Sequence, residues 1–310
     1  MKNTLYQQSL ISIQDLSLEQ LQLLFTLAEY YRSHKDSRPN STLLEEKIIG
    51  STFFEASTRT RLSFESAAYQ LGAKVIGFSD ANNTSFATKG ESLKDSLRII
   101  GSYCDLLVMR HPAAGSARLA AETANVPVIN AGDGANQHPT QTLLDLFTMQ
   151  TAFPHLEGLN LVLVGDLKHG RTIHSLVQVA HLFKMRLYFV AINELSLPET
   201  LLFQLKCQGV EFSFHQHLED VIKKADVIYM TRIQKERMRP DDNLQPLVLN
   251  QNLLAKAKAK MKILHPLPRR EELPTELDTT PHAYYFEQAQ NGLYVRKALL
   301  SLILTKEVPL

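Results

Sequence analysis

Short apolar segments alternate with amphipathic helical segments along most of this 310-residue chain. The first series has expected strands at 47–55, 73–79, 104–111 and 126–131, with expected helices at 58–71, 91–103 and 116–124 between them. Apolar strands that alternate with helices in this way are typical of parallel sheets buried on both faces. The pattern therefore predicts an α/β fold.

A helical segment at 139–149 leads into a second alternating series. Its expected strands are 159–165, 186–192, 210–214, 226–231 and 262–265, its expected helices include 172–184, 218–224 and 247–258, and a last helix is expected at 292–305. We predict two domains, each a mainly parallel sheet with helices on both faces. The expected division is 1–138, completed by the C-terminal helix at 292–310, and 139–291.

Composition excludes several classes of protein. The 33 basic and 32 acidic residues nearly balance, which gives no general reason to expect a nucleic-acid or membrane partner. Cys104 and Cys207 lack the spacing of a disulfide framework or a zinc site. The N-terminal residues have no signal-peptide core, and no apolar run reaches the roughly 20 residues that span a bilayer. We therefore expect a soluble, cytoplasmic protein.

Basic and hydroxyl side chains follow most of the expected strands, whereas carboxylates are sparse there. The segments concerned are 57–61, 84–90, 110–112 and 134–141 in the first series, and 166–172, 231–234 and 265–268 in the second. Ligands of open parallel sheets bind beyond the carboxyl ends of the strands. These strand ends therefore suit anionic ligands.

The run Ser-Thr-Arg-Thr-Arg at 57–61 is the most informative of these segments. Ser57 has the position of an N-cap, so free backbone N–H groups should follow it. The hydroxyl groups of Ser57, Thr58 and Thr60 and the guanidinium of Arg59 would complete a cradle for a phosphate. A capped surface helix with exposed arginines would explain one serine but not the whole run. We predict that this segment binds phosphate.

Other polar residues gain weight from their shared position at strand ends. Pro139 occupies a favoured first-turn position, so His138 should cap a helix and Gln141 should lie in its first turn, both directed off the helix N-terminus. Taken singly, His138 is more often a structural cap. Arg110 could equally reach into solvent, and Lys89 could be a solvated loop residue. Their common location favours a binding role.

In the second series, Arg171 and Arg232 have no acidic neighbour beside them in the sequence. Arginine side chains of this kind bind carboxylates through two parallel hydrogen bonds. Other chemistries fit less well. The segment 161–166 resembles the start of a dinucleotide fold but lacks the glycine-rich turn, and no serine-nucleophile motif occurs. His215 and His217 have no third ligand nearby, so we expect no metal site.

The segments 57–61, 110–112 and 138–141 together resemble the carbamoyl-phosphate half of the aspartate/ornithine carbamoyltransferase family. Further motifs are similar to the aspartate branch of that family, namely 89–91, 165–172, 231–237, 265–269, 291–292 and 296–300. The ornithine branch typically carries a cysteine in the motif that here reads His-Pro-Leu-Pro. The resemblance covers almost the full chain.

This resemblance implies transfer of the carbamoyl group from carbamoyl phosphate to the α-amino group of L-aspartate. That reaction is the first committed step of pyrimidine biosynthesis, and it needs no metal or organic cofactor. The resemblance also implies that 1–138 is the carbamoyl-phosphate-binding domain and 139–291 the aspartate-binding domain, with the active site in the cleft between them.

The resemblance also implies roles for individual residues. Those expected to bind carbamoyl phosphate are Ser57, Thr58, Arg59, Thr60, Ser85, Arg110, His138, Gln141 and Leu267. Those expected to bind aspartate are Lys89, Arg171, Arg232, Gln234 and Leu267. Catalytic roles are expected for Arg59, Thr60, Lys89, Arg110 and His138. Thr60, Arg110 and His138 would donate to the carbamoyl oxygen as negative charge grows on it.

The family resemblance further implies a homotrimer whose sites are shared, with Ser85 and Lys89 reaching the neighbour's site. Whether a regulatory chain or a dihydroorotase-like partner binds stays open. The nearest alternative is another amine acceptor such as ornithine, whose cationic side chain Arg171 and Arg232 would repel. A catalytically silent homologue is a second alternative, and a dinucleotide oxidoreductase is a distant third that an absence of NAD(P)H binding would exclude.

Overall fold

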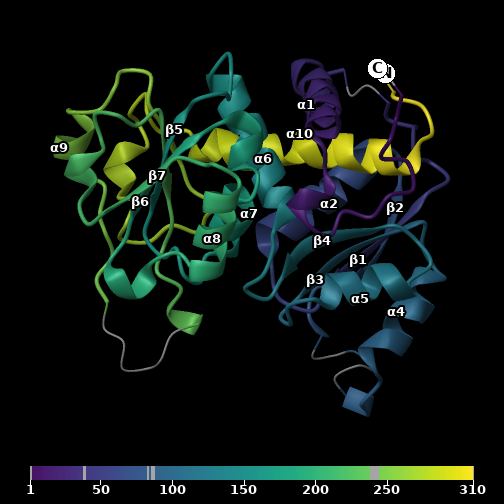
Figure 1. The fold of residues 1–310 in the computed structure, drawn as a ribbon. Helices are drawn as coiled ribbons and strands as arrows, with labels where there is room; N and C mark the ends of the chain where they lie inside the picture. Colours follow the sequence, from purple (N-terminus) through teal and green to yellow (C-terminus); the bar gives the residue numbers. More distant parts are fainter. Residues whose placement is uncertain (1, 38–39, 82–83, 85–87, 238–243, 310) are drawn as a thin grey trace. The chain divides into compact units, whose positions relative to one another are not determined.

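A computed structural model describes residues 2–37, 40–81, 84, 88–237 and 244–309 (Figure 1). The chain forms two compact units, Met1–Phe147 with Gln290–Leu310 and Thr148–Ala289. The second unit is therefore inserted into the first. The expected division before residue 139 differs from this one, because helix α6 (Pro139–Ala152) runs across both boundaries without a break.

The first unit contains a four-stranded, all-parallel sheet with the order β2-β1-β3-β4. Its strands are β1 (Ile48–Phe53), β2 (Lys74–Phe78), β3 (Leu106–His111) and β4 (Val128–Asp133). Residues of β3 and β4 are almost all buried, whereas the edge strand β2 is largely exposed. The apolar runs of the central strands thus mark a sheet covered on both faces, as the sequence predicts.

Helices cover both faces of this sheet (Figure 1). They are α1 (Leu18–Ser33), α2 (Thr58–Gln70), α4 (Leu93–Gly101), α5 (Ser116–Thr123) and the end of α10 (Tyr285–Leu304). On one face, α4 and α5 bury an apolar cluster that includes Leu97, Leu107 and Val128. On the other, α1 and α10 are joined by a buried hydrogen bond of 2.8 Å between the hydroxyl groups of Tyr31 and Ser301.

The second unit contains a five-stranded parallel sheet with the order β7-β6-β5-β8-β9. Its strands are β5 (Asn160–Val164), β6 (Arg186–Val190), β7 (Phe212–His215), β8 (Val227–Met230) and β9 (Lys262–Leu264). A large apolar cluster on this sheet includes Val164, Ile228 and Ile263. Two parallel sheets flanked by helices confirm the predicted fold class. Within the described residues, no helix combines the length and the apolar character needed to cross a bilayer.

Several predicted helices of the second unit are too long. The expected helix at 172–184 is α7 (Arg171–Val177) followed by a separate 3-10 turn, because Val179 has φ −110°. The expected helix at 218–224 is only a 3-10 turn, since Val221 has left the helical region at φ −124°. The expected helix at 247–258 is α9 (Gln251–Leu254), which starts late because Asn250 caps it. One helix, α8 (Glu199–Cys207), was not predicted.

Candidate functional site

The order of the first sheet reverses between β1 and β3, which makes their carboxyl ends a topological switch point. Ligands of open α/β sheets bind at such points. Phe53 and Arg110 lie opposite each other in the register, and the Phe54 N–H donates to the Arg110 carbonyl oxygen over 2.8 Å. The segment that leads from β1 into α2 therefore starts beside Arg110.

Helix α2 begins at Thr58, directly after this switch point. Ser57 is extended with φ −158°, and its hydroxyl makes no capping hydrogen bond to the helix. Thr60 is buried and Arg59 is exposed. The next arginine, Arg61, has a different partner, since its Nε lies 2.7 Å from the Glu65 carboxylate. The N-terminal turn of α2 thus offers backbone N–H groups, hydroxyl groups and one arginine in a single place.

Arg110 is held at the end of β3 by a carboxylate. Its Nε lies 3.3 Å from the Glu55 carboxylate, and its side chain is 13% exposed. The guanidinium is therefore fixed at the switch point, not extended into solvent. Lys89 is exposed in the connection that follows β2. Ser85, the other predicted residue of that connection, lies outside the described residues.

His138 is buried at the start of α6, at the carboxyl end of β4. Its carbonyl oxygen accepts from the N–H groups of Gln141 and Thr142 at 3.0 and 3.3 Å, so His138 occupies the cap position that the sequence predicts. Gln141 differs from the expectation in direction. Its side-chain nitrogen donates to Asp145 over 2.8 Å and so points along the helix, away from the N-terminus.

Sequence reasoning missed the residues behind Gln141. Asp145 is fully buried and interacts electrostatically with Arg296 of α10. Burial lowers the pKa of Arg296 to about 10, and Asp145 opposes that shift. The guanidinium carbon of Arg296 also lies 5.0 Å from the centroid of the Phe64 ring. The one sequence signal was a pair of charged residues, Arg296 and Lys297, within a largely apolar stretch of the last helix.

The second sheet reverses its order between β5 and β8, and this is a second switch point. Val164 and Met230 lie opposite each other, and the Thr231 N–H donates to the Val164 carbonyl oxygen over 2.9 Å. Gly165 follows with φ +109°, and a Cβ atom there would lie 2.3 Å from the Thr231 carbonyl oxygen. Only glycine allows the two strand ends to approach this closely.

Asp166 joins the two segments that leave this second switch point. Its carboxylate oxygens accept from the His169 N–H over 2.9 Å and from the Gln234 N–H over 3.1 Å. Asp166 is fully buried, so both hydrogen bonds are shielded from water. Sequence reasoning gave this residue no role, although an aspartate three residues before His169 at a strand end is a common turn signal.

The predicted carboxylate-binding residues lie around this junction. Arg171 is the buried first residue of α7, and Arg232 follows β8 in a half-buried position. A Cβ atom on Gly170 would lie 3.7 Å from the side-chain nitrogen of Gln234, so Gln234 lies close to the start of α7. The structure therefore brings Gln234 next to the residue that precedes Arg171, and it anchors both segments through Asp166.

Leu267 lies after β9, the strand that pairs with β8. It is half-buried and has φ +54°, a left-handed conformation that is uncommon for a leucine. Its N–H donates to Nδ1 of His265 over 2.8 Å. The backbone at this position is thus fixed in an unusual direction.

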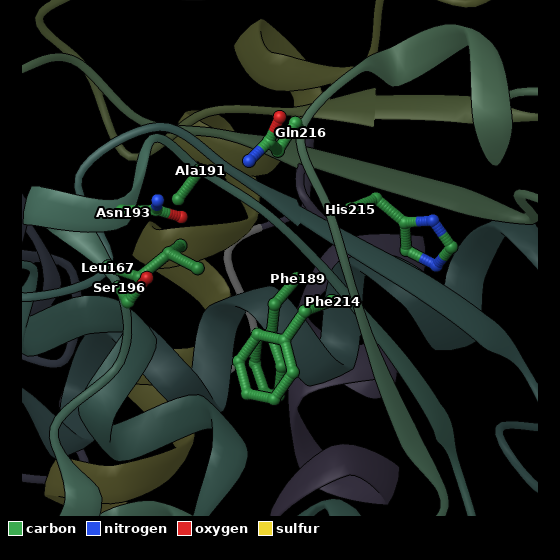
Figure 2. A pocket seen from close by; sticks show the side chains of 8 residues that line it. All are labelled: Leu167, Phe189, Ala191, Asn193, Ser196, Phe214, His215 and Gln216. Atoms are coloured by element: carbon green, nitrogen blue, oxygen red, sulfur yellow. The ribbon is translucent and has the colours of Figure 1, made fainter.

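A separate cavity of about 250 Å³ lies beyond β6 and β7 (Figure 2). Its lining residues are Leu167, Phe189, Ala191, Asn193, Ser196, Phe214, His215 and Gln216. None of them is a predicted site residue. The rings of Phe189 and Phe214 lie together on one side, with centroids 5.5 Å apart. Leu167 both lines this cavity and belongs to the loop before α7. Its N–H donates to the Leu195 carbonyl oxygen.

Within the ranges that the structure describes, no three His, Cys, Asp or Glu side chains group in a way that could hold a metal ion. The available chemistry is that of arginine, histidine and backbone N–H groups at strand ends. Residues 8–151 match the family model described as "Aspartate/ornithine carbamoyltransferase, carbamoyl-P binding domain". Residues 157–303 match "Aspartate/ornithine carbamoyltransferase, Asp/Orn binding domain". The chain belongs to the aspartate/ornithine carbamoyltransferase family.

Solved structures of this carbamoyltransferase family are similar over nearly the whole chain. Aspartate transcarbamoylase from Trypanosoma cruzi in complex with carbamoyl phosphate and aspartate is 36% identical, covers 98% of each chain and has a TM-score of 0.92. The complex of the same enzyme with N-(phosphonacetyl)-L-aspartic acid gives the same values. Its complex with carbamoyl aspartate and phosphate is 36% identical, covers 98% of this chain and 97% of that chain, and has a TM-score of 0.91.

Proposed function

We propose that this chain is an aspartate carbamoyltransferase. It transfers the carbamoyl group of carbamoyl phosphate to the α-amino group of L-aspartate and produces N-carbamoyl-L-aspartate and phosphate. One observation carries the proposal: basic and polar side chains gather at the two topological switch points, one in each unit. The Trypanosoma cruzi relatives, whose complexes contain carbamoyl phosphate, aspartate and carbamoyl aspartate, support the same reaction.

The first unit binds carbamoyl phosphate in this proposal. The N-terminal turn of α2 holds the phosphate with the hydroxyl groups of Ser57, Thr58 and Thr60 and the guanidinium of Arg59. The positive end of the helix dipole adds to this attraction. Arg110 and His138, at the carboxyl ends of the neighbouring strands β3 and β4, join Thr60 as donors to the carbamoyl oxygen.

The second unit binds aspartate. Arg171, Arg232 and Gln234 surround one junction, and the two guanidinium groups suit the two carboxylates of aspartate. Ornithine would place a cationic side chain among these arginines. Lys89 of a neighbouring chain contributes to aspartate binding. Ser85 of that neighbouring chain contributes to the binding of carbamoyl phosphate. The backbone of Leu267 contacts both substrates.

The reaction proceeds by addition and elimination at the carbamoyl carbon. The α-amino nitrogen forms a bond to this carbon, and the carbonyl electron pair moves onto the carbamoyl oxygen. Thr60, Arg110 and His138 stabilise that negative charge, and the loss of one such donor costs about 3 kcal/mol of transition-state stabilisation. The C–O bond to phosphate then breaks, and the departing phosphate accepts the proton of the amine. Binding of the two anions in a fixed orientation supplies a further part of the rate enhancement.

The physiological setting is also part of the proposal. We place the enzyme in the cytoplasm, in pyrimidine biosynthesis, as a homotrimer with sites shared between chains. Mixing a Lys89→Ala chain with an Arg59→Ala chain tests the shared sites. Each parent should be inactive, and hybrid trimers should regain part of the activity, because some sites then take both intact residues. Hybrids that stay inactive would contradict shared sites.

Formation of the ureido product tests the reaction itself. Carbamoyl phosphate is supplied with L-aspartate or with L-ornithine, and turnover is expected with aspartate alone. Arg59→Ala should abolish turnover, whereas Arg61→Ala should retain it, because the Arg61 side chain is paired with Glu65 in the same helix. Turnover with ornithine would overturn the proposed acceptor. Equal losses in the two arginine variants would overturn the phosphate site.

A further inference from the structure

A buried histidine and glutamate stand directly behind Leu267. Nδ1 of His265 accepts from the Leu267 N–H over 2.8 Å, and Nε2 of His265 lies 2.9 Å from a carboxylate oxygen of Glu272. The same oxygen of Glu272 accepts from the Arg270 N–H over 2.8 Å. His265 and Glu272 are each 2% exposed. Neither side chain belongs to the residues that are proposed to contact substrate.

These hydrogen bonds define one protonation state of the imidazole. Nδ1 accepts from a backbone N–H, so it carries no proton, and the proton of the neutral ring is on Nε2 and directed at Glu272. Burial alone would raise the pKa of Glu272. Its hydrogen bonds to His265 and to the Arg270 N–H outweigh burial and lower that pKa, which keeps Glu272 an acceptor.

The hydrogen bond from a backbone N–H to Nδ1 recurs in the first unit. Nδ1 of His111 accepts from the Ala113 N–H over 3.0 Å. Pro112 stands between them, as Pro266 stands between His265 and Leu267. Because proline has no N–H, the residue after it supplies the first backbone donor that the imidazole can reach. Each histidine is buried at or just after the end of a strand and next to a proposed substrate contact, Arg110 in one case and Leu267 in the other.

We propose that His265, held by Glu272, is a positioning residue that fixes the left-handed backbone of Leu267 and thereby directs its carbonyl oxygen at the carbamoyl NH2 group. A leucine at φ +54° is strained unless its surroundings hold it there. The Leu267 N–H to Nδ1 hydrogen bond supplies that restraint, and Glu272 prevents the imidazole from turning. This inference rests on the proposed carbamoyl transfer, in which Leu267 contacts the substrate.

Two substitutions separate the two hydrogen bonds of His265. In His265→Asn, the side-chain oxygen can replace Nδ1 and accept from the N–H two residues on, as asparagine does in turns. In His265→Gln, the longer side chain reaches the place of Nε2 and keeps the contact with Glu272 but not the one with Leu267. The same pair of substitutions at His215, in the edge strand β7 of this sheet, is the control.

Steady-state kinetics with varied carbamoyl phosphate and the thermal midpoint are measured for all four variants. His265→Asn should keep kcat/KM within a few-fold of wild type although it loses the Glu272 contact and melts lower. His265→Gln should lose on the order of tenfold to 100-fold in kcat/KM, a loss typical of a misplaced group, while it melts closer to wild type. The variant with the higher kcat/KM is therefore expected to have the lower thermal midpoint. The His215 variants should retain activity.

A purely structural role predicts instead that activity follows stability in the two His265 variants, and that result would overturn the proposal. Hydrogen–deuterium exchange of the peptide that contains Leu267 tests the restraint without the reaction, with faster exchange expected in His265→Gln than in His265→Asn. If the proposed carbamoyl transfer is itself wrong, the wild-type protein will be inactive, whereas the difference in exchange between His265→Gln and His265→Asn will remain. Should a variant not fold, the imidazole 15N spectrum of the wild type decides, since a protonated Nδ1 would overturn the proposal.

Discussion

The side-chain nitrogen of Gln141 donates to a carboxylate oxygen of Asp145 over 2.8 Å, and Asp145 in turn interacts with the buried guanidinium of Arg296. Because a carboxylate only accepts, this hydrogen bond sets the positions of the nitrogen and the oxygen of the Gln141 amide. Because the nitrogen is committed to Asp145, we propose that the carbonyl oxygen is the atom of Gln141 that accepts a hydrogen bond from the carbamoyl NH2 group. The orientation of a proposed substrate contact thus depends on a charge that is buried on another helix.

Asp145→Asn should therefore affect both activity and stability. The asparagine can donate as well as accept, so Gln141 loses its fixed direction, and we expect kcat to fall about tenfold or more. The buried Arg296 also loses its countercharge, which should cost about 3 kcal/mol or more of the free energy of unfolding. Urea unfolding and product formation measure the two effects. Glu29→Gln, which breaks an exposed ion pair with Arg32, is the control and should cost less than about 1 kcal/mol.

Substitution in the proposed carboxylate clamp should separate the two substrates. Arg232→Lys keeps the positive charge but removes the planar pair of donors. We expect KM for aspartate to rise about tenfold or more, with KM for carbamoyl phosphate unchanged. Initial rates with each substrate varied in turn measure both constants, with the exposed Arg270→Lys as control. An equal rise in both KM values would contradict a clamp that is specific for aspartate.

Gly165→Ala tests the close approach at the second switch point. A methyl group there meets the Thr231 carbonyl oxygen and also forces a non-glycine residue into φ +109°. Gly209→Ala shares only the second problem, because φ is +68° and nothing lies within 4 Å of the added atom. We expect Gly209→Ala to cost about 1 kcal/mol and Gly165→Ala clearly more. Similar unfolding free energies would mean that the strand ends can separate without loss.

The decrease in the free energy of unfolding at acidic pH should depend on Asp226. Burial by itself raises the pKa of Asp226, but hydrogen bonds from Lys258 and Asn160 outweigh it and lower the pKa. A carboxylate whose pKa is lowered in the folded state contributes stability above its unfolded pKa, about 3.9, and that stability is lost as pH falls through the folded value.

We therefore expect Asp226→Asn to reduce the free energy of unfolding at neutral pH and to flatten its decline below about pH 4. Chemical unfolding at a series of pH values provides the measurement. Glu157→Gln is the matched control, because Glu157 forms an exposed ion pair with Lys184. If the free energy of unfolding of Asp226→Asn declines at acidic pH as steeply as that of the wild type, other carboxylates cause the decline.

The sequence predicts the strands well because their apolar runs are local features. Every predicted strand matches an observed one, and β1 and β5 lie within the predicted ranges. Helices of the second unit were predicted less well, because single backbone angles at Val179 and Val221 end them. Motifs at the strand ends were sufficient to find the candidate site residues, since parallel strands bring their carboxyl ends to one edge.

The residues that support the site were beyond the reach of such reasoning. Asp166 bonds to Gln234 across 68 positions of the chain, and Arg296 reaches Asp145 from the last helix. Neither pairing leaves a periodic or local signal. Glu272 and His265 lie only seven positions apart, but their contact depends on the turn between them. Local patterns thus locate the candidate residues at the strand ends, whereas long-range pairs fix the segments that carry them.

The insertion of Thr148–Ala289 into the other unit sets an order for biosynthesis. The inserted unit is complete when Ala289 has left the ribosome, whereas the first-made unit still lacks the buried Ala298, Leu299 and Leu302. The side-chain nitrogen of Asn3 donates to the carbonyl oxygens of Leu302 and Thr305, so these hydrogen bonds form only after both residues have been synthesised. During translation the part that is made first is therefore finished last, and a nascent chain arrested near Ala289 would expose an unsealed core to chaperones and proteases.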